Sequence, residues 1–415
     1  MTIHQRLLES LNLSAIEDAP EAELRQEIAA ISRETLADIG VVVNAQEFET
    51  LIGALIDEVT GLGPLEPLLK DPTVTDILVN THTQCFVERF GRLELTEVQF
   101  KDERHLMRVI DKIVSAVGRR VDESQPWVDA RLKDGSRVNA LVPPCAVDGP
   151  LLSIRKFSKQ PYGIDKLLEF DAFSEDMALF LQAVVGTRLN VLVSGGTGSG
   201  KTTTLNALSS FISNVERIVT IEDTAELQLQ QVHVGRMESR PPNIEGKGEV
   251  SQRDLLRNAL RMRPDRIIVG EVRGGEVLDM LQAMNTGHDG SMTTIHANSP
   301  RDAIGRIENM VSMAGVDMPM KAVRAQIAAA IHVIVQVSRL ADGTRRMVSI
   351  QEITGMEGDV VAMQEIFRFD RRTVAEDGRV IGDYVATGIR SANADRFLQW
   401  GVALPQDLFA PGRRG

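Results

Sequence analysis

Residues 189–213 constrain the fold of this 415-residue chain more than any other segment. They begin with a short apolar run, Val191, Leu192 and Val193, which is long enough for a buried strand. A loop then matches the pattern G-x-x-x-x-G-K-[ST] and consists of Gly195, Gly196, Thr197, Gly198, Ser199, Gly200, Lys201 and Thr202. Apolar residues recur at helical spacing after the loop, and the order strand, glycine loop, helix is the context that this pattern needs.

The residue types in this loop predict a site for the phosphates of ATP. Glycine lets backbone N–H groups turn inward without Cβ clashes, and the helix that follows directs its positive end to the same point. Lys201 would reach the β- and γ-phosphates, and the Thr202 hydroxyl would hold Mg²⁺. The alternative is a glycine-rich turn before an ordinary helix, but every fixed position and both flanks match the phosphate-binding pattern.

Bulk composition excludes several classes of protein. The length allows two to four domains of roughly 150 residues each, and a hydrophobic content of 43% is ample for packed cores. The net charge of -12 argues against a broad nucleic-acid footprint, although a local basic channel is compatible with it. Two cysteines, Cys85 and Cys145, are too few for a structural zinc site or a disulfide framework. Without an apolar leader or an apolar run near the ~20 residues of a spanning helix, we expect a soluble, cytoplasmic protein.

Hydrophobic periodicity predicts three regions. Residues 1–62 read as helices that form either a docking module or a cap on the next domain. Residues 63–157 mix strands and helices, and we expect a smaller α/β domain there. Residues 158–415 alternate strands and helices around the glycine loop and end in a run of strands, which predicts an α/β core with a mostly parallel sheet covered on both sides. Within this core, residues 232–250 are rich in glycine, proline and charge, and we expect a surface loop.

A hairpin in the smaller domain brings arginines together. Residues 127–132 and 137–142 read as strands around Lys133-Asp134-Gly135, and a three-residue loop pairs Arg131 with Arg137. Directly paired residues share a face, so the two charges repel unless an anion lies between them. Arg155 follows in the segment SIRKF, before the next domain. The alternative is a solvated polar face of the sheet.

Acidic and histidine residues mark the ends of later strands. Glu222 ends the strand after the glycine-loop helix, and Glu271 ends the strand IIVGE. Ligands bind at the carboxyl edge of such sheets, so either carboxylate could polarise water or act through Mg²⁺. His288 and His296 bracket a further strand and could line the phosphate site or respond to its state. Taken singly, each acid could be a helix cap and each histidine a structural residue.

Four motifs in order resemble the secretion ATPase superfamily of type II secretion, type IV secretion and type IV pili. GGTGSGKTT, which ends at Thr203, resembles its Walker A motif, and TIEDTAEL resembles its Asp box. IIVGEVRG resembles its Walker B motif, and TGHDGSMTTIHAN its His box. The segment EITGMEGDVVAMQEIF further resembles the CpaF-type branch, the tight-adherence (Tad/Flp) pilus ATPases.

The resemblance implies a homohexameric ring whose subunits pair a PAS-like domain with a RecA-like core. ATP hydrolysis in that family drives pilin assembly through an inner-membrane platform protein, so we expect a peripheral position at the inner membrane. By position, Glu222 is the catalytic glutamate, Glu271 the Mg²⁺-linked one, and Arg131, Arg137 and Arg155 approach the γ-phosphate. Glu226 is the next candidate for the base. The chain lacks the four-cysteine zinc module of many relatives, which favours the CpaF or conjugation-like branches.

Three other functions compete with the Tad pilus motor. A type IV secretion ATPase has the same chemistry and a different client. A nucleic-acid translocase would also use a RecA-like core, but the negative charge and the aromatic content of 4% leave little basis for strand tracking. A nucleotide-dependent scaffold with little turnover is disfavoured by the complete acidic and histidine motifs.

Overall fold

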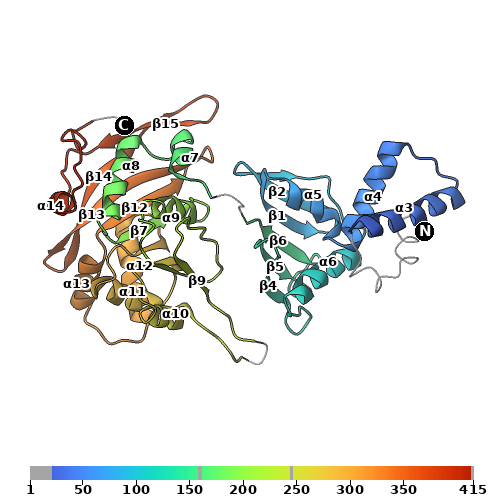
Figure 1. The fold of residues 1–415 in the computed structure, drawn as a ribbon, viewed down its shortest axis with the longest axis horizontal. Helices are drawn as coiled ribbons and strands as arrows, with labels where there is room; N and C mark the ends of the chain where they lie inside the picture. Colours follow the sequence, from blue (N-terminus) through green and yellow to red (C-terminus); the bar gives the residue numbers. More distant parts are fainter. Residues whose placement is uncertain (1–20, 158–160, 244–245, 413–415) are drawn as a thin grey trace. The chain divides into compact units, whose positions relative to one another are not determined.

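A computed structural model describes residues 21–157, 161–243 and 246–412 of the chain (Figure 1). It divides into two compact units, Met1–Ser158 and Lys159–Gly415, which are described in turn. No helix among the described residues is both long and apolar enough to cross a membrane.

The described part of the first unit begins with two helices, α3 (Glu21–Asp38) and α4 (Ala45–Val59). A capping box starts α4, because the Asn44 side chain accepts from the Glu47 N–H while the Glu47 side chain accepts from the Asn44 N–H. The two helices pack through a small apolar cluster of Leu24, Ile28, Ile52, Leu55 and Ile56. The sequence predicted helices over residues 1–62, of which 1–20 lie outside the described residues.

A six-stranded antiparallel sheet forms the rest of the first unit, in the order β3-β2-β1-β6-β5-β4. The long helix α6 (Glu103–Ala116) buries Leu106, Ile110 and Ile113 in the core of this unit, as their spacing predicts. The other elements are η1 (Gly63–Leu65), α5 (Glu66–Lys70), β1 (Val74–Thr81), β2 (Gln84–Arg89), β3 (Arg92–Leu95), β4 (Trp127–Arg131), β5 (Arg137–Leu141) and β6 (Leu151–Arg155).

The second unit is built on a nine-stranded sheet in the order β15-β14-β13-β12-β7-β11-β10-β8-β9. The six strands from β12 to β9 in this order are parallel, and β13, β14 and β15 extend the sheet in antiparallel fashion. The strands are β7 (Val191–Gly195), β8 (Ile218–Glu222), β9 (Val234–Glu238), β10 (Arg266–Val272), β11 (Met292–His296), β12 (Val333–Arg339), β13 (Arg345–Glu357), β14 (Val360–Val374) and β15 (Val380–Ala386).

Helices cover both faces of this sheet and create two separate apolar cores. One core holds side chains of α8 and α9, and the other holds side chains of α10, α11, α12 and α13, which gather together in Figure 1. The helices are α7 (Ile164–Glu169), α8 (Glu175–Gly186), α9 (Lys201–Ser209), α10 (Gln252–Ala259), α11 (Glu276–Asn285), α12 (Pro300–Met313), α13 (Met320–Ala330) and α14 (Ala394–Gln399). The predicted α/β core with a mostly parallel, doubly covered sheet is therefore confirmed.

The prediction of a surface loop over residues 232–250 is partly wrong. β9 lies inside this segment and pairs in parallel with β8 at the edge of the sheet. An edge strand is half exposed and needs no continuous apolar run, so Val234 and Met237 alone gave too weak a pattern. The remainder of the segment is irregular in the described residues, apart from a bridge between Arg240 and Val250.

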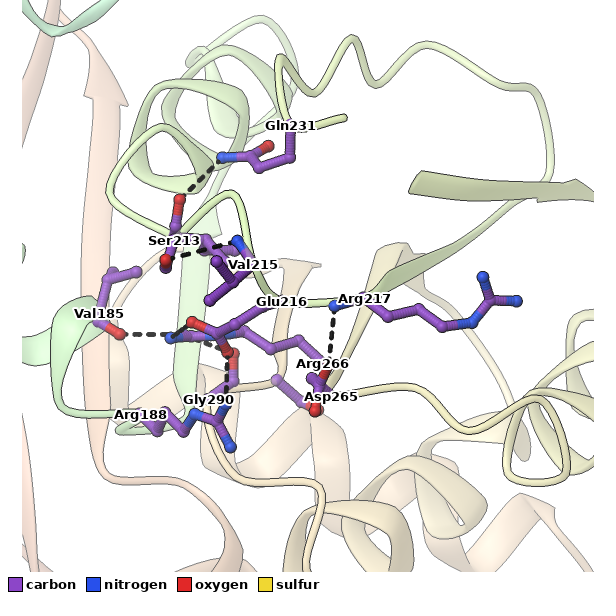
Figure 2. A network of polar contacts seen from close by, with 12 residues as sticks. Val185, Arg188, Ser213, Val215, Glu216, Arg217, Gln231, Asp265, Arg266 and Gly290 are labelled. Atoms are coloured by element: carbon purple, nitrogen blue, oxygen red, sulfur yellow. Dashed lines mark hydrogen bonds and ion pairs between the residues drawn. The ribbon is translucent and has the colours of Figure 1, made fainter. Parts of the chain in front are cut away.

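A buried ion pair lies where β10 begins, at the amino edge of the parallel strands (Figure 2). Arg266 is only 1% exposed, and its Nε and Nη2 lie 2.8 and 3.0 Å from the two carboxylate oxygens of Glu216. Its Nη1 donates to the Val185 carbonyl at 2.9 Å, and Arg188 adds a second cation to Glu216 at 2.9 Å. A Cβ on Gly290 would lie 2.6 Å from Arg266 Nη1, so only glycine permits this approach.

Candidate functional site

The glycine loop joins the centre of the sheet to the first turn of α9. All five residues of β7 are buried, and the chain leaves the sheet at Gly195. Gly198 and Gly200 then take left-handed conformations, with φ of 69° and 94°, and α9 starts at Lys201. The Ser199 hydroxyl and the Lys201 ammonium donate to the Gly196 carbonyl at 2.8 and 3.1 Å. The loop therefore curls around the amino end of α9, where the free N–H groups and positive dipole of the helix favour an anion.

A chain of alternating charges runs from Lys201 along the carboxyl edge of the sheet. Lys201 Nζ lies 3.7 Å from Glu271 Oε1, and Arg273 Nε lies 2.7 Å from the other oxygen of Glu271. Arg273 also reaches Asp223 Oδ2 at 3.5 Å. Burial lowers the pKa of the Lys201 ammonium, while Glu271 opposes that shift. The structure thus brings Glu271 to the lysine of the loop, and Arg273 is a neighbour that the sequence did not single out.

Glu222 occupies the carboxyl end of β8 and is almost fully buried. Its Oε2 accepts hydrogen bonds from the Glu226 and Leu227 N–H groups at 2.8 and 2.9 Å, and its Oε1 has no partner among the described residues. Burial raises the pKa of Glu222 to about 7, although the two N–H groups lower it. A carboxyl with this pKa can exchange a proton at neutral pH, which suits a general base.

Glu222 lies farther from the glycine loop than Glu271 does. β11 and β10 separate β8 from β7, an offset of roughly 14 Å at the usual spacing of strands. Glu271 lies on the nearer strand β10 and contacts Lys201 directly. The two predicted acids therefore lie at different distances from the loop. This fits a metal-linked role for Glu271 and a water-activating role for Glu222.

The two histidines lie at opposite ends of β11. His296 ends β11 directly beside Gly195, the first residue of the glycine loop. His288 precedes β11, where Ser291 Oγ donates to its carbonyl at 2.7 Å, and Ser291 leads into the strand at its amino end. Parallel strands keep these two ends apart, so the structure brings only His296 to the glycine loop of its own unit.

Three arginines form one row in the first unit. Arg131 pairs with Arg137, and Arg137 pairs with Arg155, across β4, β5 and β6. The hairpin register is the one predicted, because the Leu132 N–H donates to the Ser136 carbonyl and Gly135 is left-handed. Arg155 Nε also donates to Asp76 Oδ1 at 3.0 Å. Their contact with a γ-phosphate stays a prediction.

One further arginine of the second unit contacts the glycine loop, and a second lies near it. Arg345 Nε donates to the Gly198 carbonyl at 2.9 Å, and Arg339 Nη1 lies 3.7 Å from where a Cβ on Gly198 would stand. Sequence reasoning missed both, because they follow the loop by well over a hundred residues and only the position of β12 beside β7 brings them to it. The turn signal Asp342-Gly343 between them was the one local indication.

A comparison with known families decides the relationship. The family described as Type II/IV secretion system protein matches residues 58–382, most of the chain. The chain belongs to this family. The match includes the glycine loop and every candidate residue described above.

Relatives within the family carry names from conjugation and secretion. A putative conjugal transfer protein of Mycobacterium tuberculosis is 39% identical over 354 residues, which cover 84% of this chain and 97% of that protein. The conjugal transfer protein TrbB of Rhizobium radiobacter is 32% identical over 294 residues, covering 70% of this chain and 86% of TrbB.

Solved structures support the fold of the family member. The Legionella pneumophila ATPase DotB matches with a TM-score of 0.50 and 18% identity, over 82% of this chain and 83% of DotB. This likeness concerns the fold alone and agrees with a mixed α/β chain that contains a RecA-like core.

Proposed function

We propose that this protein hydrolyses ATP and that the hydrolysis powers transport through a conjugation-like type IV secretion system. The observation that carries the ATPase proposal is the glycine loop of the RecA-like core, with Lys201 paired to Glu271 from a neighbouring strand end. The family and the conjugal transfer relatives support the transport role.

Each candidate residue has a distinct role in this proposal. The N–H groups of the loop from Gly195 to Thr203 and the Lys201 ammonium bind the phosphates. Thr202 and Glu271 supply the oxygens that would hold Mg²⁺, an ion that neutralises charge on the β- and γ-phosphates. Glu222 accepts the proton of the attacking water. Glu226 is the alternative base, because it lies in the loop whose N–H groups hold Glu222.

The proposal extends to the assembly. We propose that residues 63–157 form a PAS-like domain, that residues 158–415 form the RecA-like ATPase domain, and that six subunits form a ring. Such a ring would act at the cytoplasmic side of the inner membrane against platform proteins of the transport machine. Its client would move through that machine, and the net charge of -12 argues against direct tracking of nucleic acid.

A second client is favoured by one segment. EITGMEGDVVAMQEIF, which resembles the Tad/Flp pilus branch, forms the hairpin of β13 and β14. In that case the motor extrudes, and in some cycles retracts, a pilus of pilin subunits. Disruption of the gene distinguishes the two clients. Loss of a conjugation-like motor abolishes transfer to recipient cells, whereas loss of a Tad motor abolishes surface pili.

Lys201→Ala tests the ATPase site. The substitution removes the side-chain cation of the glycine loop, so we expect phosphate release to fall about a hundredfold or more while the circular dichroism spectrum stays unchanged. Lys321→Ala is the matched control, because Lys321 is exposed and pairs with Asp359 outside the site. Wild-type turnover in Lys201→Ala would refute the assignment of the site.

A further inference from the structure

The hairpin of β12 and β13 extends past the end of the strand that carries the glycine loop. β12 runs parallel to β7, and Val337 pairs with Gly195, the last residue of β7. β12 continues for two more residues, so Arg339 lies beyond the end of β7, where the glycine loop begins. β13 returns from the turn with Arg345 as its first residue.

Both arginines converge on one glycine of the loop. Arg345 Nε donates to the Gly198 carbonyl at 2.9 Å, and a Cβ on Gly200 would lie 3.6 Å from Arg345 Cδ. Arg339 Nη1 lies 3.7 Å from the corresponding Cβ position on Gly198. Both arginine side chains therefore lie close to the part of the loop that leads into the first turn of α9.

The register of the hairpin places these charges directly opposite each other. Arg339 is the strand partner of Arg345, so the two side chains lie on the same face of the hairpin. The turn between them is fixed, because Asp342 accepts hydrogen bonds from Thr344 N–H at 2.9 Å and from Val380 N–H at 2.8 Å. The fold thus holds two exposed cations together at a phosphate-binding loop.

We infer that Arg339 and Arg345 bind the phosphate chain of the nucleotide from the same subunit as the glycine loop. The inference rests on the proposed nucleotide site and adds a second cationic wall to it. The planar guanidinium group matches the geometry of phosphate oxygens and binds them in pairs. Because the arginines belong to the same unit as the loop, they contact the phosphates that ADP and ATP share.

This role differs in kind from that of the arginine row on β4, β5 and β6. An interaction that is equal in the ground state and the transition state changes the affinity for substrate and leaves the rate at saturation unchanged. Arg339 and Arg345 should therefore set the KM for ATP and the affinity for ADP. They should have little effect on kcat.

The test measures ADP binding and ATPase kinetics of the full chain with Arg339→Ala, Arg345→Ala and Arg345→Lys. We expect each alanine variant to weaken ADP binding and raise the KM for ATP about tenfold, with kcat within twofold of wild type. Arg345→Lys keeps the charge and loses the fork, so its affinity should lie between wild type and alanine. AMP, with one phosphate, should lose less affinity than ADP.

Arg379→Ala is the matched control, since Arg379 is an exposed arginine of the same unit that pairs with Asp377 in its own turn. Folded alanine variants with unchanged ADP affinity would overturn the inference. So would a large fall in kcat at unchanged affinity. If the wild-type protein binds no nucleotide, the proposed function fails. If only Lys201→Ala loses nucleotide binding, the proposed function stands and the inference about Arg339 and Arg345 fails.

Discussion

Glu222 shows how one side chain can be held ready to accept a proton. The fold gives one carboxylate oxygen two N–H donors and leaves the other buried without a partner among the described residues. The first arrangement keeps the side chain in place, and the second disfavours its charge. The outcome is a pKa of about 7, well above the ordinary value for a glutamate.

We predict that kcat/KM for Mg·ATP rises with pH through about 7 and then levels off. The folded-state pKa is raised, so below this pH Glu222 is mostly protonated and cannot act as a base. Glu222→Gln should bind an ATP analogue normally, lose most turnover and lack the rising limb. Binding of a non-hydrolysable analogue across the same pH range corrects for the ionisation of ATP.

Glu226→Gln is the companion variant for this profile. If Glu222 is the base, Glu226→Gln keeps both the rising limb and most of the turnover. If the rising limb of the pH profile is lost in Glu226→Gln and kept in Glu222→Gln, Glu226 is the base.

At the scale of elements, the two edges of the large sheet carry different kinds of polar group. The carboxyl edge holds Lys201, Glu271 and Arg273 in contacts that a ligand can rearrange. The amino edge holds the pair of Arg266 and Glu216, which is buried and already saturated by protein groups (Figure 2). We therefore expect the amino edge to affect stability and not nucleotide binding.

We predict that Arg266→Met lowers the free energy of unfolding by about 3 kcal/mol, because it leaves Glu216 buried with Arg188 as its remaining charged partner. The double variant Arg266→Met with Glu216→Leu should recover part of this loss, since both buried charges are then gone. Urea unfolding measures both values. An unchanged midpoint in the single variant would contradict a stabilising pair, and the KM for ATP should not move in either variant.

The large sheet could be predicted where its strands are continuous apolar runs. β7 and the first part of β10 are such strands, and the glycine loop between β7 and α9 follows from local sequence. The edge strand β9 and the helix α13 were not predicted. β9 is only partly buried, and α13 buries only Val323, Ile327 and Ala330. Arg273, Arg339 and Arg345 could not be assigned to the site either. Their positions depend on which strands are neighbours, and strand order does not follow chain order here.

At the scale of the whole molecule, each of the two units carries arginines that we propose bind the same nucleotide. Lys201, Arg339 and Arg345 belong to the second unit, and Arg131, Arg137 and Arg155 belong to the first. In the first unit, Asp76 is the strand partner of Arg155. Arg137 and Arg131 follow on the next two strands, on the same face of the sheet. If the row binds the γ-phosphate as we propose, ATP would favour a state in which the first unit closes over the nucleotide of the second.

We predict that Arg131→Ala retains ADP affinity, loses turnover on the order of 10³-fold, and no longer becomes compact with a non-hydrolysable ATP analogue. The reason is that the row would contact only the γ-phosphate. Small-angle scattering with and without the analogue measures compaction. Arg92→Ala removes an exposed arginine from the opposite edge of the same sheet and should behave as wild type.

A separate outcome would contradict the prediction that the first unit closes over the nucleotide. If Arg131→Ala and Arg137→Ala both compact and hydrolyse like wild type, the row is a solvated sheet face. The signal for domain position must then come from another part of the chain.

The start of β13 also links the glycine loop to the segment by which the chain enters the second unit. Arg345 contacts the glycine loop, the next residue Arg346 contacts Asp171, and the Met347 N–H donates to the Ala172 carbonyl at 2.7 Å. Tyr384 also donates to the Asp171 carbonyl at 2.7 Å. Residues 171–172 lie shortly after the point where the chain enters this unit. If the unit works under load, tension applied at that entry point would therefore reach the phosphate-binding loop across three consecutive residues of one strand.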